Sequence, residues 1–188
     1  MKLILLRHGE TEEEKKGIIL GRLPGTLSDN GKEQAKKVAE TIKLSKITPE
    51  IIISSDLARA VGYAAIIGRE LNLKIESEPL IRERSAGEVE GIAQDKIDWE
   101  EYEKIAKPLR KHAGGESFED VWGRAKEFLK KIETLPFQTV LLISHSVFLA
   151  MLTMEACDWS LDDALNYDFR TPLIVDTNKK GAESLPLH

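Results

Sequence analysis

The chain has 188 residues, of which 41% are hydrophobic and 31% are charged, the composition of an ordinary globular protein, and this length predicts one domain over residues 1–188. The net charge of −5 argues against nucleic acid as a partner, but not against a small anionic substrate, because a local arginine cluster can outweigh the global sign. No apolar run reaches the roughly 20 residues of a membrane span, and no signal-peptide pattern is present, so we expect a cytoplasmic protein. Cys157 is the only cysteine, so we expect no disulfide within the chain.

Strand-like and helix-like runs alternate along the chain, which is typical of a mostly parallel sheet with helices on both faces. The first apolar run, at 3–6, is predicted as a buried strand and leads directly into Arg7-His8-Gly9. A helix is predicted over about 30–43 with Ser28 as its N-cap. A second strand at 51–54 is followed by Ser55, the expected N-cap of a helix with a buried apolar stripe. The members of this stripe are Leu57, Ala60, Val61, Ala64, Ile67 and Leu71.

The second half of the chain continues the alternation after a short strand predicted at 73–75. Residues 79–115 are the least periodic, with one short helix around 99–105, and we expect them to form a variable cap beside the site. Ser117 and Asp120 have capping-box spacing and begin a regular amphipathic helix. A strand at 139–143, an apolar helix at about 147–156 and a last strand at 173–175 complete the pattern. The prediction is an α/β fold, a three-layer α/β/α sandwich.

Four groups of polar residues follow these strands, where open parallel sheets bind their ligands. They are Arg7-His8-Gly9, the run 54–56 with Arg59, Arg82-Glu83, and His145. Two guanidinium groups can bind phosphoryl oxygens bidentately, and a neutral imidazole can attack phosphorus. A carboxyl group can protonate the leaving oxygen and then deprotonate water. We therefore expect a phosphoryl-transfer pocket at this edge of the sheet.

Each of these residues also has a structural explanation when it is considered alone. Arg59 has the spacing for a surface salt bridge on its helix, Glu83 lies in a loop between two arginines, and His145 follows an apolar strand as a core histidine would. The functional interpretation therefore depends on the groups occurring together in one chain.

Six stretches in order resemble the histidine phosphatase superfamily, which includes cofactor-dependent phosphoglycerate mutases and alpha-ribazole phosphatase. They are RHGET at 7–11, GRLPGTLSDNGKEQA at 21–35, SSDLARA at 54–60, IRERSAGEVEG at 81–91, GGESFEDVWGRA at 114–125 and ISHS at 143–146. The resemblance implies a phosphoglycerate mutase-like fold that requires no metal. It also implies that His8 is phosphorylated, that Arg7 and Arg59 clamp the phosphoryl group, that Glu83 is the acid and base, and that His145 is the second histidine.

Further residues are expected to contact the substrate. The resemblance implies this for Arg22 and Arg82, while Gly9 permits close approach of the backbone and Ser146 adds a hydrogen-bond donor. Ser146 stands where members of the family usually have Gly.

Two more departures concern Glu14, where many members have Asn, and Tyr63, where they usually have Thr. A carboxylate at Glu14 would repel phosphate unless it points away.

We expect a phosphatase that hydrolyses small phosphate monoesters through a phosphohistidine on His8, without a cofactor. The partner is then a small anionic phosphoester, and the sequence leaves a homo-oligomer open. Mutases of this superfamily tend to be longer, which favours the phosphatase. One alternative is a mutase, which would need bisphosphoglycerate as a priming donor, and another is a catalytically silent phosphate-binding module. A protein phosphohistidine phosphatase is a third, and would require the basic stretch 107–112 to lie away from the site.

Overall fold

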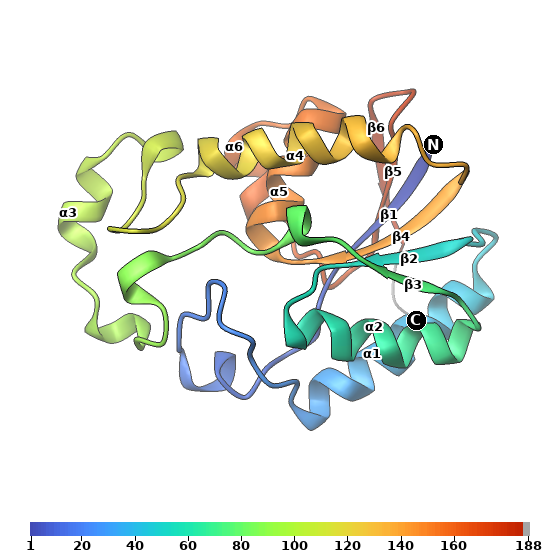
Figure 1. The fold of residues 1–188 in the computed structure, drawn as a ribbon, viewed down its shortest axis with the longest axis horizontal. Helices are drawn as coiled ribbons and strands as arrows, with labels where there is room; N and C mark the ends of the chain where they lie inside the picture. The colour runs from blue at the N-terminus through green and yellow to red at the C-terminus, as the bar shows by residue number, and fades with distance from the viewer. Residues whose placement is uncertain (186–188) are drawn as a thin grey trace.

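The computed structural model describes residues 1–185, which form a six-stranded sheet with helices on both faces (Figure 1). Its strands are β1 (Lys2–Arg7), β2 (Ile51–Ser54), β3 (Ile75–Ser77), β4 (Thr139–Ser144), β5 (Leu173–Asp176) and β6 (Gly181–Ser184). They lie in the order β3-β2-β4-β1-β5-β6. The first four are parallel, whereas β5 pairs antiparallel with both β1 and β6. The predicted α/β fold with a mostly parallel sheet is confirmed.

The helices divide into two layers and one outlying element (Figure 1). One layer holds α1 (Asp29–Leu44) and α2 (Ala58–Leu71), which pack on each other. The other holds α4 (Phe118–Ile132), α5 (Ser146–Cys157) and α6 (Leu161–Asn166). The short helix α3 (Trp99–Lys104) lies away from the sheet within the long connection between β3 and α4.

The central strand β1 explains why both faces of the sheet are covered. Leu3 and Leu5 join the core beneath α4 and α5, while Ile4 and Leu6 join the core beneath α1 and α2. All four side chains are completely buried. A strand with two buried faces needs a continuous apolar run, which is why this segment does not alternate with polar residues.

Several predicted boundaries were wrong, each for a local reason. Helix α2 begins after Leu57, and Ser55 is not its N-cap: the Ser55 hydroxyl accepts from the Leu57 amide at 3.3 Å, ahead of the helix, and contacts a histidine described below. Val61 is 45% exposed, whereas Tyr63 is completely buried on the inner face of α2. Strand β3 starts at Ile75, not at 73, because Asn72 ends α2 in the left-handed conformation and Leu73 still bonds back to the helix.

The capping box was predicted correctly. The Ser117 hydroxyl accepts a hydrogen bond from the Asp120 amide, and the Asp120 carboxylate accepts one from the Ser117 amide.

The buried thiol of Cys157 has a pKa raised by its burial to about 11, which suits a packing role. Within residues 1–185, no helix combines the length and the apolar content of a membrane span. The cytoplasmic location, the single-domain organisation and the oligomeric state stay predictions.

Two helical glycines provide a test of how closely the first loop packs on the helix layer. A Cβ at Gly31 in α1 would lie 2.2 Å from the Glu10 carbonyl oxygen, whereas a Cβ at Gly123 in α4 would meet nothing within 4 Å. We expect Gly31→Ala to lower the free energy of unfolding by more than about 2 kcal/mol, because backbone must move. Gly123→Ala is the matched control and should raise it by about 0.5–1 kcal/mol. Urea unfolding of both variants measures this, and equal effects would contradict the close packing.

Candidate active site

Parallel pairing of β1 with β4 brings the two histidines together. The register places Arg7 beside Ser144, so the residues that follow, His8 and His145, leave the same edge of the sheet. Their ring centroids are 5.1 Å apart. Arg59 enters from the first turn of α2, and Glu83 from the connection after β3. The four predicted polar groups therefore do meet at one edge.

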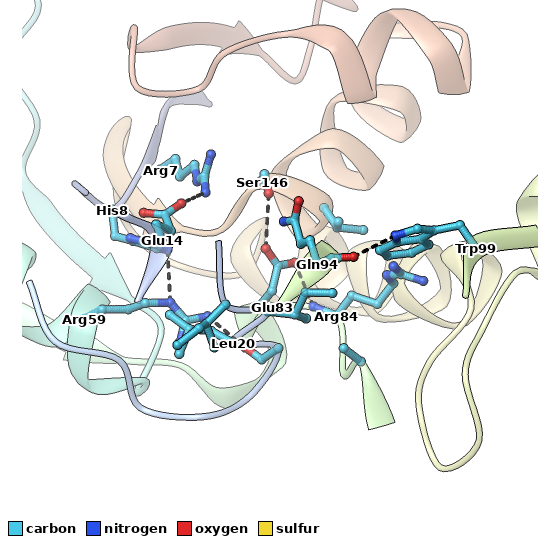
Figure 2. A pocket seen from close by; sticks show the side chains of 15 residues that line it. Arg7, His8, Glu14, Leu20, Arg59, Glu83, Arg84, Gln94, Trp99 and Ser146 are labelled. Carbon is cyan, nitrogen blue, oxygen red and sulfur yellow. Dashed lines mark hydrogen bonds and ion pairs between the residues drawn. The ribbon is translucent and has the colours of Figure 1, made fainter. Parts of the chain in front are cut away.

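A cavity of about 300 Å³ lies at this edge (Figure 2). Its wall includes Arg7, His8, Arg59 and Ser146. The loop at 18–21 also lines it, and the segment 79–115 contributes Glu83, Arg84, Ala86, Gln94 and Trp99. The segment predicted as a cap thus forms part of the wall, although sequence periodicity gave no indication of which of its side chains would do so.

The two hydrogen bonds of His8 assign different roles to its two ring nitrogens. Nδ1 lies 2.7 Å from the carbonyl oxygen of Gly9, which can only accept, so this nitrogen carries the proton. Arg59 Nε donates to Nε2 at 3.0 Å, so Nε2 holds a lone pair. Burial, followed by the charges of Arg59 and Arg7, lowers the pKa of His8 well below its usual value. The imidazole is therefore neutral at pH 7.

His145 is also completely buried, and its Nε2 lies 2.8 Å from the Ser55 hydroxyl oxygen. Burial, with smaller effects of His8 and Arg59, holds its pKa well below the usual value. Ser55 thus orients the second histidine instead of capping α2. This function could not be read from the sequence, because β2 and β4 are far apart in the chain.

Arg59 is only 2% exposed and holds the neighbouring loop in place. Its terminal nitrogens donate to the carbonyl oxygens of Gly21 at 2.8 Å, Pro24 at 3.3 Å, and Leu23. These backbone contacts fix the direction in which Nε points at His8. A guanidinium group that is oriented in this way loses little conformational entropy when an anion binds.

Glu83 is held by a backbone amide and by a hydroxyl. Its Oε1 accepts from the Arg84 amide at 2.7 Å, and its Oε2 accepts from the Ser146 hydroxyl at 3.3 Å (Figure 2). Ser146 therefore lies in the cavity wall as a donor, but the group to which it donates is the carboxylate. The serine that stands in place of the usual glycine positions Glu83.

The structure does not bring three of the expected substrate contacts into the cavity wall. Arg82 forms an ion pair with Asp56, and Arg22 donates to Glu116 at 2.9 Å. Gly9 packs on other groups, since a Cβ there would lie 2.7 Å both from the Gly31 carbonyl oxygen and from a ring atom of Tyr63. Its missing side chain serves packing, and the unusual tyrosine fills the adjoining space.

The basic stretch 107–112 also lies outside the cavity wall. Lys107 pairs with Asp162, and Arg110 donates to the carbonyl oxygens of Glu103 and Ile105. Its side chains thus bind neighbouring surface groups.

Sequence reasoning missed a carboxylate that anchors the cap segment. Glu116 accepts from Arg22, from two nitrogens of Arg124 and from the Ser85 amide, all at 2.9–3.0 Å. Sequence reasoning also missed Arg170, which contacts Glu14 across 156 positions of the chain. Glu116 lies in the stretch 114–125 of the family resemblance, which gave it no role, and Arg170 lies outside all six of those stretches.

Glu14 points into the cavity, not away from it. Its Oε1 accepts from Arg7 (Figure 2) and from Arg170, the latter at 3.0 Å, and its Oε2 accepts from the Thr11 amide at 3.1 Å. Over residues 1–185, no three His, Cys, Asp or Glu side chains are grouped so as to hold a metal ion. The independence from metal stays a prediction.

A family model, Histidine phosphatase superfamily (branch 1), matches residues 3–176. The chain belongs to this superfamily. It is 34% identical over 154 residues to phosphoserine phosphatase 1 of Hydrogenobacter thermophilus, covering 78% of this chain and 72% of that protein. It is 33% identical over 158 residues to a probable phosphoglycerate mutase of Photorhabdus laumondii, covering 81% and 73%.

The fold is similar to that of a crystal structure of a putative alpha-ribazole-5'-P phosphatase from Escherichia coli. The TM-score is 0.84 at 24% identity, with 98% of this chain and 94% of that one covered. The expected membership and the phosphoglycerate mutase-like fold are thus confirmed. Because the similar proteins include both phosphatases and a mutase, they leave the choice between the two reactions to other arguments.

The depressed pKa values make the buried histidines a source of acid instability. Below about pH 6.5 the unfolded chain binds a proton at each histidine that the folded protein does not bind, so stability falls as the pH decreases. Each histidine then makes the free energy of unfolding fall by about 1.4 kcal/mol for every pH unit of acidification. We expect His145→Gln, whose side chain can still bond to Ser55, to reduce the slope between about pH 6 and 5 by this amount. Urea unfolding across that range measures the slope, and identical slopes would contradict a neutral buried His145.

Proposed function

We propose that this protein is a phosphatase that hydrolyses small phosphate monoesters through a phosphohistidine on His8. The observation that carries the proposal is the pair of hydrogen bonds on that ring. Nδ1 donates to the Gly9 carbonyl, so the lone pair is on Nε2, where it accepts from Arg59 Nε; attack on phosphorus requires this N–H to turn to a phosphoryl oxygen. A neutral imidazole with a directed lone pair is a competent nucleophile toward phosphorus.

The surrounding charges fit the transferred group. Arg7 and Arg59 line the same cavity as His8, so a phosphoryl group on His8 would have positive charge on two sides. The buried guanidinium of Arg59 lies in a region where charge stabilisation is stronger than in water. His145, held by Ser55, adds a second imidazole beside the nucleophile.

Glu83 is the group we assign to proton transfer in both steps. In the first step it would protonate the leaving oxygen while the bond from phosphorus to Nε2 forms. In the second step it would take a proton from water as the oxygen of that water attacks phosphorus and frees the histidine. Ser146 and the Arg84 amide hold the carboxylate in the cavity wall, as both steps require.

The cations around the cavity support hydrolysis over a mutase reaction. A mutase with a bisphosphorylated intermediate needs a second cationic group for the phosphate that is not reacting. Within the described chain, Arg84 is the additional arginine of the wall, and its Nη1 donates to Tyr102 and to two carbonyl oxygens. Arg22 and Arg82 are paired with carboxylates outside the wall. The wall at Ile18, Ile19 and Leu20 is apolar.

Glu83→Gln separates the two chemical steps when the leaving group needs no proton. With radiolabelled p-nitrophenyl phosphate, we expect the variant to form phosphohistidine while its hydrolysis slows by about 10²–10⁴-fold, because the base for water is lost. Acid-labile, alkali-stable label should therefore accumulate on the variant. Glu88→Gln, an exposed carboxylate of the same segment, is the matched control and should turn over like the wild type.

His8→Ala completes this experiment and should take up no label. Label that persists in His8→Ala would contradict the assigned nucleophile. Tight phosphate binding by a wild-type protein that never becomes labelled would instead support the silent binding module.

A phosphatase transfers the phosphoryl group from His8 to water, whereas a mutase transfers it to a second hydroxyl group, so the two products distinguish the reactions. With 3-phosphoglycerate and a catalytic amount of bisphosphoglycerate, we expect release of inorganic phosphate to exceed formation of 2-phosphoglycerate. Phosphoserine and glucosyl-3-phosphoglycerate, named for relatives of this chain, extend the substrate panel. Isomerisation faster than phosphate release would overturn the proposal, and activity that survives His8→Ala would come from elsewhere.

A further inference from the structure

A carboxylate lies at the guanidinium group that the proposed function assigns to phosphate. Glu14 Oε1 accepts from Arg7 Nη2, and both side chains are in the cavity wall. The Nε of Arg7 is buried and has no protein partner in the described part of the chain. Arg7 thus donates to a carboxylate through Nη2, while its Nε remains available to another acceptor.

Phosphate and the Glu14 carboxylate cannot both occupy the same side of Arg7 at low cost. Both are anions, and the attraction of the carboxylate to Arg7 reduces the positive potential that would bind phosphate. Like charges at a few ångströms repel strongly in a partly buried site. Arg59 cannot compensate fully, because its terminal nitrogens donate to backbone carbonyls.

Arg170 gives the carboxylate a second position of attachment. Its Nη2 donates to the same Oε1 at 3.0 Å, so Glu14 bridges two arginines. Glu14 begins the short 3-10 turn Glu14–Lys16, which Gly17 ends with φ 67°. A rotation of the Glu14 side chain, with loss of its bond to the Thr11 amide, would release Arg7 while Oε1 stays with Arg170.

We propose that Glu14 is an internal anion that competes with phosphate for Arg7 and moves onto Arg170 when phosphate binds. This inference rests on the proposed function, because it takes Arg7 as a phosphate-binding residue. It makes Glu14 and Arg170 determinants of phosphate affinity that do not touch the transferred group. A site with this arrangement binds the product phosphate less tightly and releases it more readily.

Titration calorimetry with inorganic phosphate, at constant ionic strength, tests the competition. We expect Glu14→Gln to lower the Kd for phosphate about tenfold, equivalent to about 1.4 kcal/mol, because the amide has a similar shape and no charge. Glu14→Asn should also lower the Kd for phosphate, and it tests whether the effect comes from loss of the charge and not from the shape of the glutamine side chain. Glu12→Gln is the matched control in the same loop, and loss of its exposed pair with Lys15 should change the Kd less than about twofold.

Arg170→Met tests the second half of the proposal. Without Arg170 the carboxylate keeps only Arg7 as a cationic partner, so we expect phosphate affinity to fall several-fold in the wild-type background. In the Glu14→Gln background the same substitution should change affinity little. Equal losses in both backgrounds would show that Arg170 contacts phosphate itself and would overturn its assigned role.

The outcomes separate this inference from the proposed function. Unchanged or weaker phosphate binding in both Glu14 variants, with a phosphohistidine that still forms on His8, would overturn the competition alone. A wild-type protein that neither binds phosphate nor forms phosphohistidine would overturn the proposed function, and the inference with it.

Discussion

The parallel pairing of β1 with β4 is the constraint on which the site depends. Residues 7 and 144 are neighbours in this register, so the chain leaves both strands at the same level of the same edge. The ring centroids of the two histidines that follow these strands are 5.1 Å apart. A slip of one residue in a parallel pair would turn the side chains of one strand toward the other face. The apolar residues 3–6 of β1 and 140–143 of β4 are completely buried, which fixes both strands deep in the sheet.

Much of this arrangement could be predicted because it follows from local patterns. Apolar runs of strand length mark β1, β2 and β4, and the capping box at Ser117 marks the start of α4. The rule that ligands bind at the carboxyl ends of parallel strands then brings His8, Arg59 and His145 together. The exposed strand β6 and the six-residue helix α6 could not be found in this way, because they are too short or too polar to show a period.

The roles of individual polar residues were harder to predict, because they depend on partners far away in the chain. Ser55 looks like a helix cap in sequence, yet it orients His145, which directly follows β4. Arg22 and Arg82 belong to stretches of the family resemblance, but each is paired with a carboxylate outside the cavity wall. An arginine is attracted to the nearest anion, and the sequence does not show which anion that will be.

Glu116 holds the connection between β3 and α4 in place beside the cavity. One carboxylate there accepts hydrogen bonds from Arg22, Arg124 and the amide of Ser85, so three separate parts of the chain converge on it. Glu116 is thus one attachment of the outlying lobe in Figure 1, together with backbone hydrogen bonds between residues 17–19 and 91–94 and the ion pair of Lys107 with Asp162. Displacing the lobe would strip several partners from one partly buried charge at once. Movement of this lobe away from the cavity would therefore have to break several hydrogen bonds to Glu116 together.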